Sequence, residues 1–459
     1  MRAGSPVSFR DPAGSVRLDA STVRRRIQPG FESSTLEFLR TALFQEWVGR
    51  GCIPPARAMD CGNFLELEHP RISFISYAWE WCPAQLRAAA ELTLDLCRDA
   101  IAAGYILKDA IPANVLFEGT RPVFVDVLSF EKRESGCPLW LAQGQFVRSF
   151  LLPLLAQRHL GWPLAATQLR RDGYEPGALY AALSWLQRLR PGLLSTITLP
   201  TWLEANPNRP RANSRLAKPM RQRPEIATAV LLDNLARLRR RVQRAAPPLP
   251  PSQWSDYTTS AHHYSAADHA AKQAFVARAL SEARPQNVLD LGANTGTYSG
   301  LAAAHGARVV AIDREPTAVE QLWRNAQTEG WNVLPLAADI ARPTPALGWN
   351  NTETFSLLER LEGKFDLVLL LALMHHLLLT DQIPLEQIAQ LTARLTRKHA
   401  LVEWIPQRDP QFQFLLRGRD ALYRHLDLDG MRTAFNPTFR VAAQCELANG
   451  RTLVLFEKR

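Results

Sequence analysis

The stretch N287-V-L-D-L-G-A-N-T-G-T-Y-S-G300 decides the fold of the C-terminal half of this chain. Its first five residues predict a buried strand over 287–291, which Gly292 and Gly296 interrupt before a helix expected over 298–305. In a parallel sheet, a strand that turns into a helix at glycines leads to the edge where small cofactors bind. The stretch therefore predicts a cofactor site at the carboxyl ends of the strands.

Units of strand and helix continue after this stretch. We expect strands at 308–313, 332–337, 365–371 and 399–405, with helices at 316–329 and 384–395 among their connections. Four acidic residues recur at spacings of 23, 26 and 27 residues, the length of one strand, helix and connection: Asp290, Asp313, Asp339 and Asp366. That period predicts a doubly wound, Rossmann-like parallel sheet. Strands expected at 439–447 and 451–456 flank Asn449-Gly450, a strong hairpin signal, so the sheet should end in an antiparallel hairpin.

The turn after the first strand distinguishes between cofactors. A dinucleotide loop would need glycine at positions 294 and 297, where this chain has Asn294 and Thr297. The segment D-L-G-A-N-T-G at 290–296 instead resembles motif I of class I S-adenosylmethionine-dependent methyltransferases. The resemblance implies that the cofactor is S-adenosylmethionine and that the loop backbone approaches its methionine part. The cofactor-binding residues implied here are Asp290, Gly292, Ala293, Asn294 and Gly296.

Further residues match the same methyltransferase pattern. Asp313 corresponds to the acid that binds both ribose hydroxyls, since one carboxylate can accept two hydrogen bonds. Asp339 with Ile340 corresponds to the acid that reads the adenine amino group. Tyr264 and Lys272 resemble the lid helix that closes over the cofactor. The alternatives are that the acids only cap helices and that Tyr264 and Lys272 only cover surface.

The segment A372-L-M-H-H-L377 after the fourth of these parallel strands lines the transfer site in related methyltransferases. His375 or His376 is a candidate general base, or a group that orients the substrate. Glu403, in the fifth strand, is a further catalytic candidate. A packed or capping histidine and a partnered structural carboxylate are the alternatives.

The N-terminal half contains a second informative segment, G104-Y-I-L-K-D-A-I-P-A-N114, followed by a strand pair around Gly119 and then Asp126. Asp109, Asn114 and Asp126 resemble the catalytic segment of protein kinases, in which the loop aspartate accepts a proton and the other two bind metal. The chain departs from that pattern because no glycine-rich loop or V-A-I-K-like lysine strand precedes it and Val127 replaces the phenylalanine of D-F-G. Active phosphotransfer, a degenerate kinase-like scaffold and coincidence stay open. We expect metal at Asn114 and Asp126 only in the first case and none at the transfer site.

The chain of 459 residues is too long for one ordinary core. We predict an N-terminal α+β domain over 1–200, an Arg/Pro-rich linker with a connecting helix over 201–252, and a methyltransferase domain over 253–459. The proline-rich stretch at 245–252 is the clearest boundary. Within the first domain we expect a helix at 35–48, a strand at 71–79 and a long helix at 83–103.

Composition limits the partners and the compartment. The net charge of +10 suggests an anionic partner such as nucleic acid, a membrane surface or a phosphorylated substrate, and arginine is densest over residues 209–244. A solvated helix face is the alternative explanation of this charge. No apolar run is long enough to span a membrane. Six cysteines without a C-x-x-C pair, and a start without an apolar signal segment, favour reduced thiols and a cytoplasmic location.

Features in both halves resemble a group of bacterial methyltransferases related to a nodulation protein. They include Ser76-Tyr77, Glu80-Trp81, the 107–114 segment, His375-His376 and Glu403. The sequence thus predicts an S-adenosylmethionine-dependent methyltransferase with an unidentified methyl acceptor. The alternatives are an ATP- and magnesium-dependent phosphotransferase acting through the N-terminal domain, and a non-catalytic RNA- or protein-binding scaffold.

Overall fold

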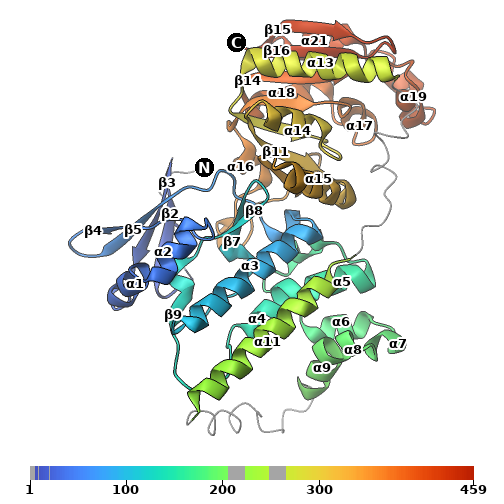
Figure 1. The fold of residues 1–459 in the computed structure, drawn as a ribbon. Coiled ribbons are helices and arrows are strands. Elements are labelled where there is room, and N and C mark those ends of the chain that lie inside the picture. The colour runs from blue at the N-terminus through green and yellow to red at the C-terminus, as the bar shows by residue number, and fades with distance from the viewer. Residues whose placement is uncertain (1–5, 9, 20, 205–222, 248–264) are drawn as a thin grey trace. The chain divides into compact units, whose positions relative to one another are not determined.

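The structure is a computed structural model that describes residues 6–8, 10–19, 21–204, 223–247 and 265–459. The chain divides into two compact units, a first unit ending at residue 248 and a second unit beginning at residue 249. Each contains its own sheet (Figure 1). Tyr264 and residues 205–222 of the arginine-rich segment lie outside the described residues.

The first unit begins with a five-stranded antiparallel sheet in the order β1-β2-β3-β5-β4. Its strands are β1 (Pro6–Ser8), β2 (Gly14–Leu18), β3 (Thr22–Ile27), β4 (Arg57–Asp60) and β5 (Leu65–Pro70). The helix expected at 35–48 is two helices, α1 (Glu32–Leu39) and α2 (Ala42–Gly49), because the Thr41 hydroxyl accepts from the N–H of Phe44 and starts a new helix. The strand predicted at 71–79 is wrong: this segment pairs with no strand and ends in a short 3₁₀ turn, η1 (Ala78–Glu80).

The rest of the first unit is mainly helical around α3 (Pro83–Ala102), which confirms the helix expected there. The predicted strand pair around Gly119 is the hairpin of β7 (Val115–Glu118) and β8 (Arg121–Phe124), while β6 (Tyr105–Leu107) pairs with β9 (Phe130–Lys132). Helix α11 (Pro224–Ala245) buries an apolar stripe and packs beside α3 (Figure 1). The connecting helix of the predicted linker is therefore part of the first unit.

Seven strands form the sheet of the second unit, in the order β12-β11-β10-β13-β14-β16-β15. The parallel strands are β10 (Asn287–Leu291), β11 (Arg308–Asp313), β12 (Val333–Ala337), β13 (Phe365–Leu370) and β14 (Thr396–Trp404). The predicted terminal hairpin is β15 (Phe439–Glu446) with β16 (Thr452–Lys458), and β16 also pairs antiparallel with β14. The doubly wound sheet with an antiparallel end is confirmed.

Helices cover both faces of this sheet, which is why every residue of β13 is buried (Figure 1). One core joins alternate strand residues to α13 (Ala266–Ala283), α14 (Thr297–Ala304) and α15 (Pro316–Glu329). Helix α18 (Leu385–Leu395) packs on β13 and β14 and also contacts α21 (Leu428–Phe435). The chain leaves β10 toward β11 on one side and returns to β13 on the other, so the strand order reverses at β10 and a crevice forms at the carboxyl ends.

Among the residues that the structure describes, no helix is both long and apolar enough to cross a bilayer.

Candidate functional site

The turn between β10 and α14 forms the centre of the site. Gly292, Asn294 and Gly296 have φ values of +73°, +48° and +91°, a region that glycine adopts freely and asparagine tolerates. A Cβ on Gly296 would lie 1.9 Å from Leu322 Cδ1, so the close approach of α15 also requires glycine. The N–H groups of Gly292 and Ala293 donate to the carbonyl of Ile312 at 2.8 and 3.1 Å, which fixes the turn against the end of β11.

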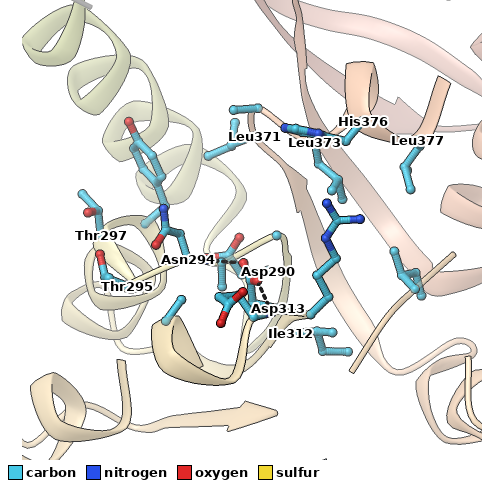
Figure 2. A pocket seen from close by; sticks show the side chains of 18 of the residues that line it. Asp290, Asn294, Thr295, Thr297, Ile312, Asp313, Leu371, Leu373, His376 and Leu377 are labelled. Atoms are coloured by element: carbon cyan, nitrogen blue, oxygen red, sulfur yellow. Dashed lines mark hydrogen bonds between the residues drawn. The ribbon is translucent and has the colours of Figure 1, made fainter. Parts of the chain in front are cut away.

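A cavity opens beside this turn (Figure 2). Residues from β10 and β11, from the segments that follow β10, β11, β12 and β13, and from α13 surround it. Most of the sequence-predicted site residues line it: Lys272, Asp290, Gly292, Ala293, Asn294, Asp313, Asp339, Ile340 and His376. Gly296, His375 and Glu403 are not among its lining residues, and Tyr264 lies outside the described part of the chain.

Asp313 and Asp339 each face the cavity from the end of a strand. The two carboxylate oxygens of Asp313 accept from the N–H groups of Asn294 and Glu315 at 2.8 and 2.9 Å (Figure 2). Burial raises the pKa of Asp313, and these two N–H donors oppose the rise. Asp339 accepts from the N–H of Ala341 at 2.8 Å and pairs with Arg342 at 3.0 Å. Since each carboxylate oxygen has two lone pairs, both acids can still accept a hydrogen bond from a ligand.

Asp290 lies deeper, at 3% exposure, and accepts from the Ser299 hydroxyl at 2.6 Å. Burial raises its pKa to about 6, while the Ser299 hydrogen bond and Lys272 lower it and Asp313 raises it. Asp366, the fourth of the regularly spaced acids, does not line the cavity. It accepts from the N–H groups of Gln286 and Asn287, where β10 begins.

Lys272 and Glu403 form a buried ion pair. Lys272 Nζ of α13 lies 2.7 Å from Glu403 Oε2 at the end of β14, and the two residues are 3% and 0% exposed. The same oxygen accepts from the N–H of Ala372 at 2.8 Å, and Ala372 has a φ of +51° in the segment that lines the cavity. Glu403 thus fixes the backbone of Ala372 beside the cavity, and the ion pair with Lys272 fixes Glu403.

This ion pair extends to the terminal hairpin. Arg451 Nη1 lies 3.9 Å from Glu403 Oε1, and Arg451 Nε lies 2.7 Å from Asp409 Oδ2. Arg451 is 0% exposed, and Asp409 caps α19 (Pro410–Leu416). Four charges therefore connect α13, β14, the hairpin and α19. Asp409-Pro410 is one of the sequence features shared with the related methyltransferases, but sequence reasoning assigned Asp409 no role and did not single out Arg451, because the partners of Arg451 lie 42 or more residues away.

The two histidines lie side by side on α17 (Met374–Leu379), with ring centroids 4.3 Å apart. His376 lines the cavity, and burial lowers its pKa to about 4, with Arg314 lowering it further. His375 is 2% exposed, and within the described residues neither of its ring nitrogens has a hydrogen-bond partner. Burial and then His376 lower its pKa well below the usual value. Both imidazoles are therefore neutral at pH 7.

Arg314 and Tyr298 are among the lining residues that were not predicted. Arg314 follows Asp313 directly, and Tyr298 is the second residue of α14, with its ring 4.9 Å from Lys272 Nζ. Their places in the sequence, one residue after the strand-end acid and two after Gly296, are the signals that could have identified them.

The three polar residues predicted in the first unit also come together. Asn114 Nδ2 donates to the Asp109 carbonyl and to the Ser129 hydroxyl at 3.3 and 3.2 Å, and that hydroxyl donates to Asp126. Arg25 of β3, a cation that sequence reasoning missed, pairs with Asp126 at 2.5 Å. Burial raises the pKa of Asp109. Asp126 is therefore already engaged by a cation from within the chain.

Residues 236–411 match a family model described as a methyltransferase domain. The chain is an S-adenosylmethionine-dependent methyltransferase with a Rossmann-like sheet, and its methyl acceptor is unspecified.

Among individual proteins, the chain is similar to the nodulation protein NoeA of Rhizobium meliloti (strain 1021). The two are 27% identical over 471 residues, which cover 98% of this chain and 95% of NoeA. Solved structures with similarity include the N-methyltransferase NodS from Bradyrhizobium japonicum WM9, with a TM-score of 0.30 and 16% identity over 42% of this chain and 96% of that one. Another is magnesium protoporphyrin IX methyltransferase from Synechocystis PCC 6803 with bound S-adenosylmethionine, with a TM-score of 0.31 and 15% identity over 45% of this chain and 95% of that one.

Proposed function

We propose that S-adenosylmethionine binds in the cavity at the carboxyl ends of β10 to β13. Asp313 binds the ribose hydroxyls, Asp339 and Ile340 contact the adenine, and the turn at 292–296 contacts the methionine part. One observation carries this proposal: a glycine turn and the acids at or just after the carboxyl ends of β10, β11 and β12 line a single cavity.

The polar atoms of the cavity fit this cofactor. Asn294 Oδ1 is buried and accepts no hydrogen bond from any described residue. Leaving such an oxygen unsatisfied costs about 1–3 kcal/mol, which a donor on the ligand would remove. The spare lone pairs of Asp313 suit two hydroxyls, and the apolar side chains of Ile312, Ile340 and Leu377 suit a flat ring.

The bound cofactor supplies a methyl group activated by the attached sulfonium, so the protein mainly has to align a nucleophile with it and accept a proton. His376 is the imidazole that lines the cavity, and it is neutral at pH 7 and can accept that proton, although its lowered pKa of about 4 makes it a weak base. Leu373 and Leu377 beside it restrict water in this part of the cavity. We infer an acceptor whose reacting atom carries a removable proton, such as a hydroxyl or an amine.

His375 and Glu403 act in this proposal as positioning residues. Glu403 supports Ala372 through its N–H and is neutralised by Lys272, so it has no free charge to offer a substrate. His375 packs against His376 and sets the position of that ring.

Calorimetric titration tests the cofactor assignment. The chain should bind S-adenosylmethionine and S-adenosylhomocysteine, and Asp313→Ala should weaken both by on the order of 1.5–3 kcal/mol, the scale of charge-assisted hydrogen bonds. Asp429→Ala is a matched control, since this aspartate of the second unit has an 83% exposed side chain. Unchanged affinity of Asp313→Ala would mean that the ribose lies elsewhere.

A second candidate function is phosphotransfer by the first unit, which the gathering of Asp109, Asn114 and Asp126 favours. The Arg25–Asp126 ion pair opposes it, because a metal would have to displace Arg25 from the carboxylate. Titration with Mg-ATP decides this: binding that Asp126→Ala abolishes would support a nucleotide site. No ATP binding would leave a kinase-like scaffold.

Two broader assignments belong to the same proposal. The six cysteines are free, which fits the cytoplasmic location expected from the sequence. The arginines of α11 are exposed or half-buried, as an anionic partner of the arginine-rich segment requires.

A further inference from the structure

The first unit contains a small helical layer whose inner and outer faces differ. It comprises α6 (Pro176–Ala182), α7 (Trp185–Arg188), the π-helical turn η6 (Leu194–Thr198) and α9 (Leu199–Glu204). Its inner face contributes Leu179, Leu183, Leu193 and Ile197 to a separate hydrophobic core with α5 (Leu152–Leu160). Folding of this layer is thus explained without its outer side chains.

The outer face is apolar and exposed. Neither α7 nor α9 buries a single residue. Their large apolar side chains are 43–68% exposed, and we call these six residues the apolar face: Trp185, Leu186, Leu189, Leu199, Trp202 and Leu203. Single exposed leucines are common on proteins, but two tryptophans and four leucines on neighbouring helices mark an interaction surface.

The two halves of this face are joined through Tyr180 of α6. The Trp202 indole N–H donates to the Tyr180 hydroxyl at 3.2 Å. From the α7 side, Arg188 lies 4.1 Å from the Tyr180 ring and donates to its carbonyl at 3.0 Å. The apolar face is therefore one continuous surface.

Arginines lie on the α7 side of this face, and Glu204 ends α9 on the other side. Arg188 ends α7 and exposed Arg190 follows it. Gln187 donates to the His159 carbonyl, and Arg158, the residue before His159, donates to the carbonyls of Arg244 and Ala246. Over residues 148–204, six arginines against three acidic residues leave a net charge of +3. The α7 side of the face, which we call the arginine rim, is thus cationic.

We propose that the apolar face binds the surface of an anionic lipid membrane. Tryptophan and leucine enter the boundary between headgroups and acyl chains, where the indole N–H still finds acceptors, and arginines pair with lipid phosphates. A protein partner would gain equally from the apolar side chains, but the arginine rim specifies an anionic surface. Membrane attachment of this kind needs no spanning helix and is independent of the methyltransferase site.

Sedimentation of the full chain with lipid vesicles tests the proposal. Vesicles of phosphatidylcholine with an equal part of phosphatidylglycerol should bind it more tightly than phosphatidylcholine alone, and added salt should weaken binding. Trp185→Ser and Trp202→Ser should each reduce binding on the order of tenfold, and Arg190→Gln should reduce only the preference for anionic vesicles. Trp349→Ser is the matched control, because Trp349 is 71% exposed in the second unit.

An unchanged unfolding transition of the first unit in every variant would show that this unit is folded, and unchanged affinity of the second unit for S-adenosylhomocysteine keeps this test separate from the cofactor assignment. The proposal is overturned if the wild-type chain does not bind anionic vesicles, or if the tryptophan variants bind as well as Trp349→Ser. Equal binding to neutral and to anionic vesicles would contradict the proposed preference for anionic lipids. A dimer that Trp185→Ser dissociates would make this face a self-association surface instead.

Discussion

Lys272→Met is the change that most sharply tests how the cavity is supported. Methionine keeps the length of the lysine stem but removes the cation 2.7 Å from Glu403. Glu403, 0% exposed, would retain only the Ala372 N–H at 2.8 Å and Arg451 at 3.9 Å. Removing one partner of a buried pair costs about 3–5 kcal/mol, because the other charge is left uncompensated. For a unit of this size that corresponds to a fall of roughly 6–20 °C in Tm.

Thermal unfolding in the presence and absence of S-adenosylhomocysteine provides the assay. The transition that moves with this ligand belongs to the second unit, and it is the one to compare among variants. Lys272→Met with Glu403→Gln should lose about 1.5 kcal/mol less than the sum of the two single changes, since the glutamine still accepts from Ala372 without a charge.

Arg278→Met is the control on the same helix. Its pair with Glu282 spans 3.8 Å between side chains that are more than half exposed, so its loss should change stability by no more than about 0.5 kcal/mol. Equal effects of Lys272→Met and Arg278→Met would refute the view that the buried pair supports the cavity.

Two further predictions follow from the turn and from Asp290. Gly296→Ala should destabilise the second unit by about 2–5 kcal/mol, since it adds a clash with Leu322 to an unfavourable φ of +91°. Gly306→Ala is the control, because its φ of +85° and open space leave only the backbone cost. Similar losses of stability in denaturant unfolding of the two variants would contradict the predicted clash. In the folded chain Asp290 keeps its proton up to about pH 6, whereas in the unfolded chain it loses the proton near pH 4. The contribution of Asp290 to the free energy of unfolding should therefore decrease as the pH rises from about 4 to about 6. Asp290→Asn should remove that decrease, and parallel pH profiles of the wild type and the variant would contradict the raised pKa.

The sheet of the second unit was predictable because its signals are local. The parallel strands are short apolar runs, β10 is followed by a glycine and β11 ends at an acid, and the Asn449-Gly450 turn fixes the terminal hairpin. Asp290, Asp313 and Asp339 could be placed because parallel strands bring their carboxyl ends to one edge. The regular spacing of the acids did not reveal where Asp366 lies, because this residue is near the start of its strand and not at the end.

Contacts between distant segments could not be predicted. Glu403 looked like a catalytic candidate, because nothing in its neighbourhood reveals Lys272, 131 residues away. The same holds for Arg25, whose partner Asp126 is about 100 residues distant. The alternating pattern at 71–79 was also misleading. Phe74 and Ser76 are buried, but burial of alternate side chains does not tell whether the backbone pairs with a neighbouring strand.

A crystal structure of the chain with S-adenosylhomocysteine tests the central claim most directly. We predict the ribose hydroxyls on the Asp313 carboxylate, the adenine beside Asp339 and Ile340, and the methionine part against the turn at 292–296 with a donor on Asn294 Oδ1. The sulfur should face the segment that contains His376. Density for the ligand outside this cavity, or a ribose turned away from Asp313, would contradict the account.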